Sequence, residues 1–171
     1  MAETNRFEIT IAQSELLNEL TAAQSVAERK TTIPILASFL LEASANDLGG
    51  GQLKITATDL DLSFQTNCTA VVKQSGSCTI PARRLHDFVK LLPGGEITIK
   101  QLDTGWIQIK AGRPNTKMVG MPRENFPQVP VFPAAGAVKL SVAALRNMIA
   151  KTIFAISNEE SRYTINGLYW S

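Results

Sequence analysis

The chain has 171 residues, with 17 Lys and Arg against 15 Asp and Glu and a formal net charge of +2. Its hydrophobic fraction of 44% and charged fraction of 19% are those of a globular protein, which excludes disordered, collagen-like and disulfide-scaffold classes. This length accommodates one ordinary domain, or one domain and part of a second. No apolar run reaches the roughly 18 residues of a membrane span, and the first residues lack the layout of a signal peptide, so we expect a cytoplasmic protein.

Cysteine and histidine are scarce. Cys68, Cys78 and the single histidine, His86, are too few to make up the roughly four ligands of a structural zinc site. We interpret both cysteines as small buried strand residues without a disulfide, and we expect no metal or other cofactor.

Apolar and polar residues alternate with period 2 along much of the chain, which is typical of antiparallel strands with one exposed face. The clearest alternating segments are residues 7–11, 53–57, 97–100 and 106–110. Further strands are predicted at residues 39–41, 62–64, 78–80 and 117–121, separated by turn signals such as Gly49-Gly50-Gly51.

Two segments before residue 125 have helical periodicity instead. The apolar stripe of the first, from Gln13 to about Ala27, consists of Leu16, Leu20, Ala23 and Ala27. The stripe of the second, which follows Pro81, consists of Leu85, Phe88, Val89 and Leu92. A few helices among many strands predict an α+β fold.

The periodicity stops in a proline-rich segment, and the first pattern then begins again. Residues 138–142 read as a strand, and an apolar stripe from Leu145 to Ile156 reads as a helix. Ile9 and Leu16 align with Val138 and Leu145 at one constant offset, which is typical of a repeated unit. We therefore predict a complete domain at 1–122, a linker at 123–137 and a truncated second domain at 138–171.

The last residues read as the interior of a strand, so we expect the chain to be an N-terminal fragment. A natural single domain with a helical C-terminal extension is the alternative.

Residues for catalysis are not assembled in any recognisable motif. His86 lies on the predicted exposed side of the second helix without a nearby Ser or Cys motif, so an exposed or partly packed histidine is expected. Asp59 and Asp61 lack the further ligands of a calcium loop, and the Gly49-Gly50-Gly51 run lacks the rest of a phosphate loop. We predict turn or cap residues in the first case and a hairpin tip in the second. A hydrolase that uses His86 stays open as an alternative.

Basic residues fall in loops and on predicted helix faces, where they can neutralise phosphates without reading bases. They are Arg29, Lys30, Arg83, Arg84, Lys90, Arg146, Lys151 and Arg162. A merely solvated surface is the alternative, and Glu15 and Glu19 of the first helix would repel a phosphate backbone.

Several short motifs occur together in a specific order. They are Lys30-Thr31-Thr32-Ile33-Pro34-Ile35-Leu36, Thr56-Ala57-Thr58-Asp59-Leu60-Asp61, Ile80-Pro81-Ala82-Arg83, Pro122 through Phe126-Pro127, and Arg162-Tyr163-Thr164-Ile165-Asn166-Gly167. By their joint order and spacing, the chain from Phe7 to Ser171 resembles the bacterial DNA polymerase III β subunits, the replicative sliding clamps.

The resemblance implies a three-domain protomer whose domains each pack two helices against antiparallel sheets. Two protomers would close head to tail into a ring with helices lining the hole. The implied function is that of a processivity factor, which encircles duplex DNA without sequence specificity and is not an enzyme. The implied partners are duplex DNA, the polymerase III catalytic subunit and other polymerases, the clamp loader and a second protomer. A stand-alone α+β interaction module without a nucleic-acid role is the alternative.

The resemblance also implies site residues. Lys30 with its neighbour Arg29, Arg83, Glu159, Tyr163 and Thr164 match DNA-contacting positions, although Glu159 is acidic where a neutral polar residue is expected. We add Arg146 and Lys151 from their place on the exposed face of the last predicted helix. Ile165 would form one wall of a peptide-binding pocket, and the last strand of the first domain would pair with the partner protomer through Thr116, Lys117, Met118 and Val119.

Overall fold

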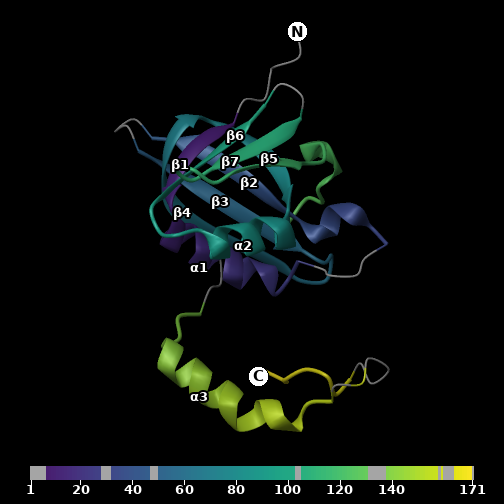
Figure 1. Ribbon diagram of the computed structural model, residues 1–171. Helices are drawn as coiled ribbons and strands as arrows, with labels where there is room; N and C mark the ends of the chain where they lie inside the picture. Colours follow the sequence, from purple (N-terminus) through teal and green to yellow (C-terminus); the bar gives the residue numbers. More distant parts are fainter. Residues whose placement is uncertain are drawn as a thin grey trace. The chain divides into compact units, whose positions relative to one another are not determined.

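The structure, a computed structural model, describes residues 7–27, 32–46, 50–102, 105–130, 138–157, 159 and 164–170 (Figure 1). The chain divides into two compact units, Met1–Val129 (unit 1) and Pro130–Ser171 (unit 2).

Unit 1 is built on an antiparallel sheet with the strand order β5-β2-β3-β4-β1-β6-β7-β8. The strands are β1 (Glu8–Ala12), β2 (Ser38–Ala45), β3 (Gly51–Thr58), β4 (Ser63–Gln74), β5 (Gly76–Pro81), β6 (Glu96–Gln101), β7 (Trp106–Lys110) and β8 (Asn115–Val119). Every strand predicted before residue 125 is confirmed, apart from residues at the ends such as Phe7 and Leu62.

Strand β4 joins the two halves of the sheet. Its first part pairs with β3, from Ser63 opposite Thr58 to Ala70 opposite Gly51, and its last residues pair with β1. The register with β1 shifts between Glu8 and Ile9, which is the mark of a β-bulge. Such a bulge bends its strand locally and increases the twist of the sheet.

The two ends of the sheet meet at Thr79 of β5. Met121 lies just beyond the end of β8. The Thr79 hydroxyl accepts a hydrogen bond from the Met121 N–H (2.8 Å) and donates one to the Met121 carbonyl (2.7 Å). Gly120 passes close to the backbone of Thr79. These contacts of Thr79 and Gly120 close the seam between β5 and the end of β8.

Helices α1 (Gln13–Gln24) and α2 (Ala82–Leu91) lie side by side on one face of the sheet (Figure 1). As the apolar stripes predict, Leu16 and Leu20 of α1 and Leu85 and Val89 of α2 are buried. They pack on inward-facing strand residues such as Ile55 in one core cluster. Pro93 cannot continue the helical hydrogen-bond pattern, and α2 ends just before it.

The segment after β8 remains attached to unit 1. It contains the short 3₁₀ helix η2 (Arg123–Asn125), and Phe126, 6% exposed, packs in a second cluster with Ile35, Leu36 and Leu40. Ile35 and Leu36 belong to another 3₁₀ helix, η1 (Pro34–Ala37). The contacts of unit 1 therefore continue to Val129, into the segment predicted as a linker, and the predicted boundaries stay predictions.

Unit 2 contains α3 (Val142–Thr152) and the 3₁₀ helix η3 (Ile153–Ala155). The Ser141 side chain caps α3 by accepting a hydrogen bond from the Ala144 N–H. The strands predicted at residues 138–142 and near residues 168–170 are wrong, because the structure has no strand there and α3 already begins at Val142. A strand needs a neighbour for its ladder hydrogen bonds, and the described residues of unit 2 supply none.

Candidate nucleic-acid interface

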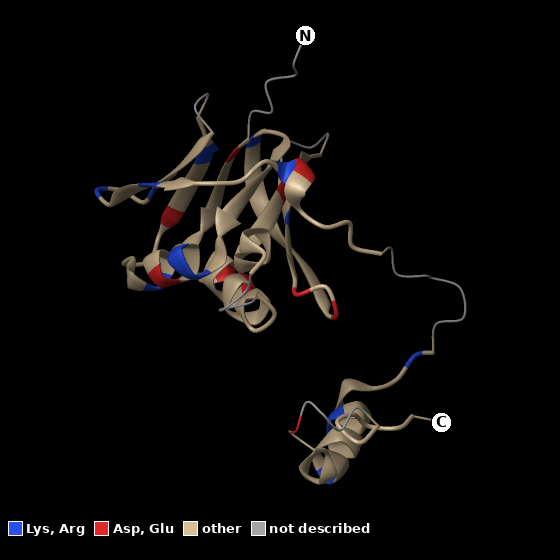
Figure 2. Ribbon diagram, turned by 90° about the vertical axis from the view of Figure 1, so that its right-hand side faces the viewer, with Lys and Arg blue, Asp and Glu red and all other residues tan. Residues whose placement is uncertain are grey.

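The exposed face of α2 carries most of the positive charge of the helix layer. Arg83, Arg84 and Lys90 are exposed, and Asp87 is the one carboxylate among them. The side chains of Arg83 and Asp87 are 79% and 58% exposed and form an i,i+4 ion pair of 3.6 Å. Figure 2 shows Lys and Arg in the helix layer as well as on the strands. The face can contact phosphates, and its charges select no base.

Helix α1 adds no positive charge to this surface. Its charged residues are Glu15 and Glu19, and the Glu19 carboxylate accepts a hydrogen bond from the Thr66 hydroxyl of β4. One of the two carboxylates that could repel a phosphate backbone is thus bound to the sheet. The remaining exposed residues of α1, such as Asn18 and Thr21, are neutral.

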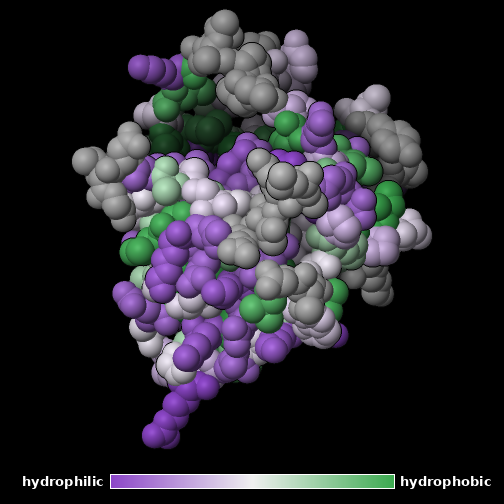
Figure 3. All heavy atoms as spheres, turned by 90° about the horizontal axis from the view of Figure 1, so that it is seen from above, coloured by the Kyte–Doolittle hydropathy of each residue, from purple (hydrophilic) through white to green (hydrophobic). Residues whose placement is uncertain are grey.

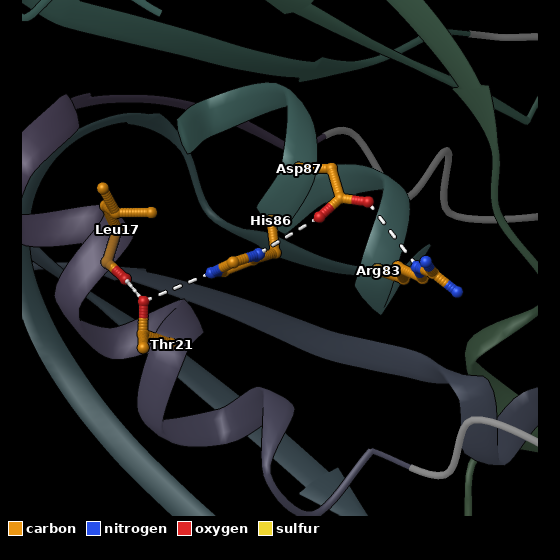
Figure 4. Close-up of polar contacts among 5 residues, drawn as sticks. All are labelled: Leu17, Thr21, Arg83, His86 and Asp87. Carbon is orange, nitrogen blue, oxygen red and sulfur yellow. Dashed lines mark hydrogen bonds and ion pairs between the residues drawn. The ribbon is translucent and has the colours of Figure 1, made fainter. Parts of the chain in front are cut away.

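A polar cluster joins the two helices (Figure 4). The Thr21 hydroxyl donates to the Leu17 carbonyl (2.7 Å), so its oxygen is an acceptor toward His86 Nε2, 3.3 Å away. Nδ1 of His86 lies 3.5 Å from Oδ1 of Asp87, and Oδ2 of Asp87 faces Nε of Arg83. The His86 side chain is 12% exposed, so the prediction of a partly packed helix histidine is confirmed.

The other predicted DNA contacts are placed only in part. Arg29, Lys30 and Tyr163 lie outside the described residues, as does Arg162. Glu159 and Thr164 are exposed, and the Glu159 N–H donates to the Ser157 hydroxyl (3.1 Å). Glu159 and Thr164 belong to unit 2, which is described by itself.

Arg146 and Lys151 are both exposed on α3, but they do not share one face. Five residues apart, they project about 140° from each other around the helix axis. Lys151 lies at an apolar hollow of about 650 Å³, lined mainly by Val138, Leu140, Met148, Ile149, Leu168 and Trp170. A DNA backbone that approaches α3 from one side could therefore contact Arg146 or Lys151, but not both.

Ile165 is 49% exposed, and its carbonyl accepts a hydrogen bond from the Ser157 N–H (2.9 Å). It is not among the described residues that line the hollow of unit 2. Its role in a peptide pocket stays a prediction.

Strand β8 forms one end of the sheet. Among the described strands it pairs with β7 alone, so its other edge presents backbone N–H and C=O groups. Lys117 and Val119 point outward, whereas Met118 is buried in the core cluster. Of the four predicted interface residues, Met118 therefore offers a partner only its backbone.

The turn prediction for Asp59 and Asp61 is confirmed, whereas the predicted glycine hairpin tip is confirmed for Gly50 alone, because Gly51 begins β3 and Gly49 lies outside the described residues. Oδ1 of Asp59 accepts hydrogen bonds from the N–H groups of Asp61 and Leu62, which closes the turn between β3 and β4. Gly50 lies in the hairpin between β2 and β3, and its N–H donates to the Asn46 side chain (2.8 Å).

Both cysteines are free thiols. Cys78 is buried in β5 and Cys68 is partly buried in β4, which confirms the predicted strand positions. Burial, followed by the carboxylates of Glu19 and Glu15, raises the pKa of Cys68 to about 11, and burial raises that of Cys78 still further.

Other kinds of site are not apparent in the described part of the chain. The described residues contain no group of three His, Cys, Asp or Glu side chains arranged to hold a metal ion. Nor does any described helix have the length and apolar character to cross a membrane. Seen from above in Figure 3, hydrophilic residues dominate and hydrophobic ones form separate small groups.

Comparison with known proteins defines the class of the fold. The family model for the DNA polymerase III beta subunit, N-terminal domain, matches residues 7–130. The beta sliding clamp of Caulobacter vibrioides is 36% identical over 163 residues, which are 94% of this chain and 42% of that protein. The Vibrio cholerae beta sliding clamp is 31% identical over 93% of this chain and 42% of its own length.

Solved structures agree with the sequence matches. A crystal structure of the C. crescentus beta sliding clamp has a TM-score of 0.85 at 34% identity and covers 97% of this chain and 43% of that one. The sliding clamp from Bacillus subtilis gives 0.84 at 25% identity, over 92% and 42%. Unit 1 thus has the α+β fold of a sliding-clamp domain.

The chain belongs to the DNA polymerase III beta subunit family. It spans 42% of the length of the Caulobacter relative, so the activity of a whole clamp is a matter for proposal.

Sequence reasoning missed the polar cluster between α1 and α2. The i,i+4 spacing of Arg83 and Asp87 could have revealed their ion pair, since such residues are neighbours on a helix. No local signal connects Thr21 with His86, which lies 65 positions away.

Proposed function

We propose that this chain is the N-terminal part of a processivity clamp that encircles duplex DNA and tethers the replicative polymerase to it. The observation that carries the proposal is the basic exposed face of α2, set beside α1 on the sheet of a sliding-clamp domain. Arg83 and Lys30, with Arg29, are the first-domain contacts. Glu159, Tyr163 and Thr164 are the contacts of the second domain, together with either Arg146 or Lys151, which lie on different faces of α3.

The proposed partners follow from the same family. They are duplex DNA, the polymerase III catalytic subunit and other polymerases, the clamp loader and a second protomer, which would pair with the open edge of β8. Ile165 would contribute to the peptide-binding pocket for the polymerases and the clamp loader. The clamp would act in the cytoplasm and catalyse no reaction itself.

Binding of this chain to a labelled duplex by fluorescence anisotropy tests the DNA-contacting face. We expect weak affinity that is independent of base sequence, decreases with salt and is lowered by Arg83→Ala and Lys30→Ala. Asp61→Ala, at an exposed turn, is the control and should not lower the affinity. If neither Arg83→Ala nor Lys30→Ala changes the affinity, a module without a nucleic-acid role would be favoured.

The ring itself requires the full-length clamp. After loading onto nicked circular DNA, the clamp should stay bound until the DNA is cut and then slide off the free ends. Retention on linear DNA with open ends would contradict encirclement. His86→Ala should leave loading intact, whereas a hydrolase that uses His86 would lose its activity.

A further inference from the structure

Asp87 lies between two possible partners on the proposed DNA-contacting face. Its Oδ2 is 3.6 Å from Nε of Arg83, and its Oδ1 is 3.5 Å from Nδ1 of His86 (Figure 4). The side chains of Arg83 and Asp87 are both more than half exposed, so a ligand in solution can reach either one.

The contact between His86 and Asp87 depends on the tautomer of the His86 ring. Because the Thr21 hydroxyl gives its hydrogen to Leu17, its oxygen can accept a hydrogen bond from His86 Nε2. In the tautomer that carries its hydrogen at Nε2, the ring presents a lone pair at Nδ1 and offers Asp87 no hydrogen bond. Among the charged groups of α2, Arg83 is then the cation that the carboxylate faces.

We propose that Asp87 weakens the contact of Arg83 with a DNA phosphate, because the carboxylate and the phosphate compete for one guanidinium group. This inference rests on the proposed function and adds a control on the strength of its contact. The guanidinium extends beyond Nε, where a phosphate can bind it, but the phosphate then lies close to a second negative charge (Figure 4). Two such charges about 6 to 7 Å apart in water lower affinity by about threefold.

A weak contact suits a protein that moves along DNA. Sequence-independent contacts must break and form again at each step, and a guanidinium already shared with a carboxylate releases a phosphate more readily than a free one does. Asp87 would thus favour movement of the protein along DNA over tight binding at one position.

A double-mutant cycle on duplex affinity tests the inference, with this chain at low ionic strength and fixed pH. We expect Asp87→Asn to tighten binding about threefold, Arg83→Ala to weaken it, and Asp87→Asn to have no effect in the Arg83→Ala background. The gain should shrink as salt screens the charges. Circular dichroism of each variant checks that α2 is intact.

Glu124→Gln is the matched control, since it makes the same change in net charge at an exposed residue of η2. Glu124→Gln should leave the affinity for duplex DNA unchanged. If it raises the affinity as much as Asp87→Asn does, the effect comes from net charge alone and the inference is overturned. Unchanged or weaker binding by Asp87→Asn, or an equal gain in the Arg83→Ala background, would also overturn it.

The same data separate the inference from the proposed function. If Arg83→Ala weakens binding but Asp87→Asn acts independently of Arg83, the DNA contact stands and the competition does not. If wild type and variants all fail to bind duplex DNA, both are rejected.

Discussion

Gly120 passes so close to Thr79 that a Cβ at position 120 would lie far inside van der Waals contact with the Thr79 carbonyl oxygen. The same Cβ would lie 3.0 Å from Cδ1 of Ile107. Since the nearest obstacle is backbone, no side-chain rotation can relieve the overlap. The requirement for glycine here comes from the closed seam between β5 and the end of β8.

Gly120→Ala should therefore destabilise unit 1 by about 1–3 kcal/mol, the usual cost of overpacking. Urea unfolding followed by circular dichroism measures the change. Gly94→Ala is the control, because a Cβ there meets no atom within 4 Å and should change the stability by less than about 0.5 kcal/mol. Equal urea midpoints for Gly120→Ala and Gly94→Ala would show that the seam between β5 and the end of β8 moves apart at little cost.

Thr79→Val tests the hydrogen bonds of the same seam. Thr79 is 1% exposed, and valine keeps its shape but leaves the Met121 N–H without its acceptor. We expect a loss of about 1–3 kcal/mol, the cost of an unsatisfied buried polar group.

Thr56→Val is the matched control for Thr79→Val. Thr56 is also 1% exposed, but its hydroxyl has no hydrogen-bond partner in the described part of the chain. Its replacement should be neutral or stabilising in the same urea experiment. A comparable loss at both positions would contradict a specific role for the Thr79 hydroxyl.

The sequence predicts those features of the fold that depend on local periodicity. Leu16 and Leu20, or Ile97 and Ile99, recur at the spacing that places them on one buried face, so the elements of unit 1 are visible along the chain. The contact of Gly120 with Thr79 is not visible, because it depends on how the sheet bends. Val138 and Leu140 show the limit of the pattern, since alternation without a neighbouring strand does not make a strand.

The candidate site is predictable to a similar extent. Arg83 follows from its place on the polar face of α2, and its pairing with Asp87 follows from helical spacing. The contribution of Thr21 depends on how α1 packs beside α2, which no local pattern encodes.

Phe126→Ala should destabilise unit 1 by about 3 kcal/mol, because Phe126 is a large side chain of the second apolar cluster. Urea unfolding followed by near-ultraviolet circular dichroism measures the loss. Phe154, 83% exposed on η3 of unit 2, provides the control, and Phe154→Ala should leave the transition of unit 1 unchanged. If Phe126→Ala also leaves it unchanged, the segment after β8 is not part of the folded unit.

Both thiols should react slowly in the folded chain. With a pKa of about 11, the Cys68 thiol is ionised to about one part in ten thousand at pH 7, and the raised pKa of the buried Cys78 makes it less reactive still. A thiol reagent such as DTNB should modify both cysteines rapidly in urea and neither rapidly without it. Fast native labelling of Cys78 would show that β5 opens readily.

Glu8 should make the stability of unit 1 depend on pH. The hydrogen bond from Lys100 (2.8 Å), opposed by partial burial and helped by the charges of Lys100 and Lys73, lowers the pKa of Glu8 from its ordinary value of 4.5. A lowered folded-state pKa gives stability that is present above pH 4.5 and is lost as the pH falls through the folded value. Because these side chains reach the surface, the contribution should be below about 1 kcal/mol.

Lys100→Met removes the main partner of Glu8 and should reduce the difference in unfolding free energy between pH 7 and pH 3. Urea unfolding at both pH values measures this difference. Lys90→Met, on the exposed face of α2, is the control and should leave it unchanged, since Lys90 is not among the residues that shift the pKa of Glu8. If Lys100→Met keeps the full difference, the acid sensitivity of unit 1 comes from other carboxylates, of which Glu42 is the next to test. Burial raises the pKa of Glu42, but hydrogen bonds from Arg123 and Lys54 outweigh that effect and lower it overall.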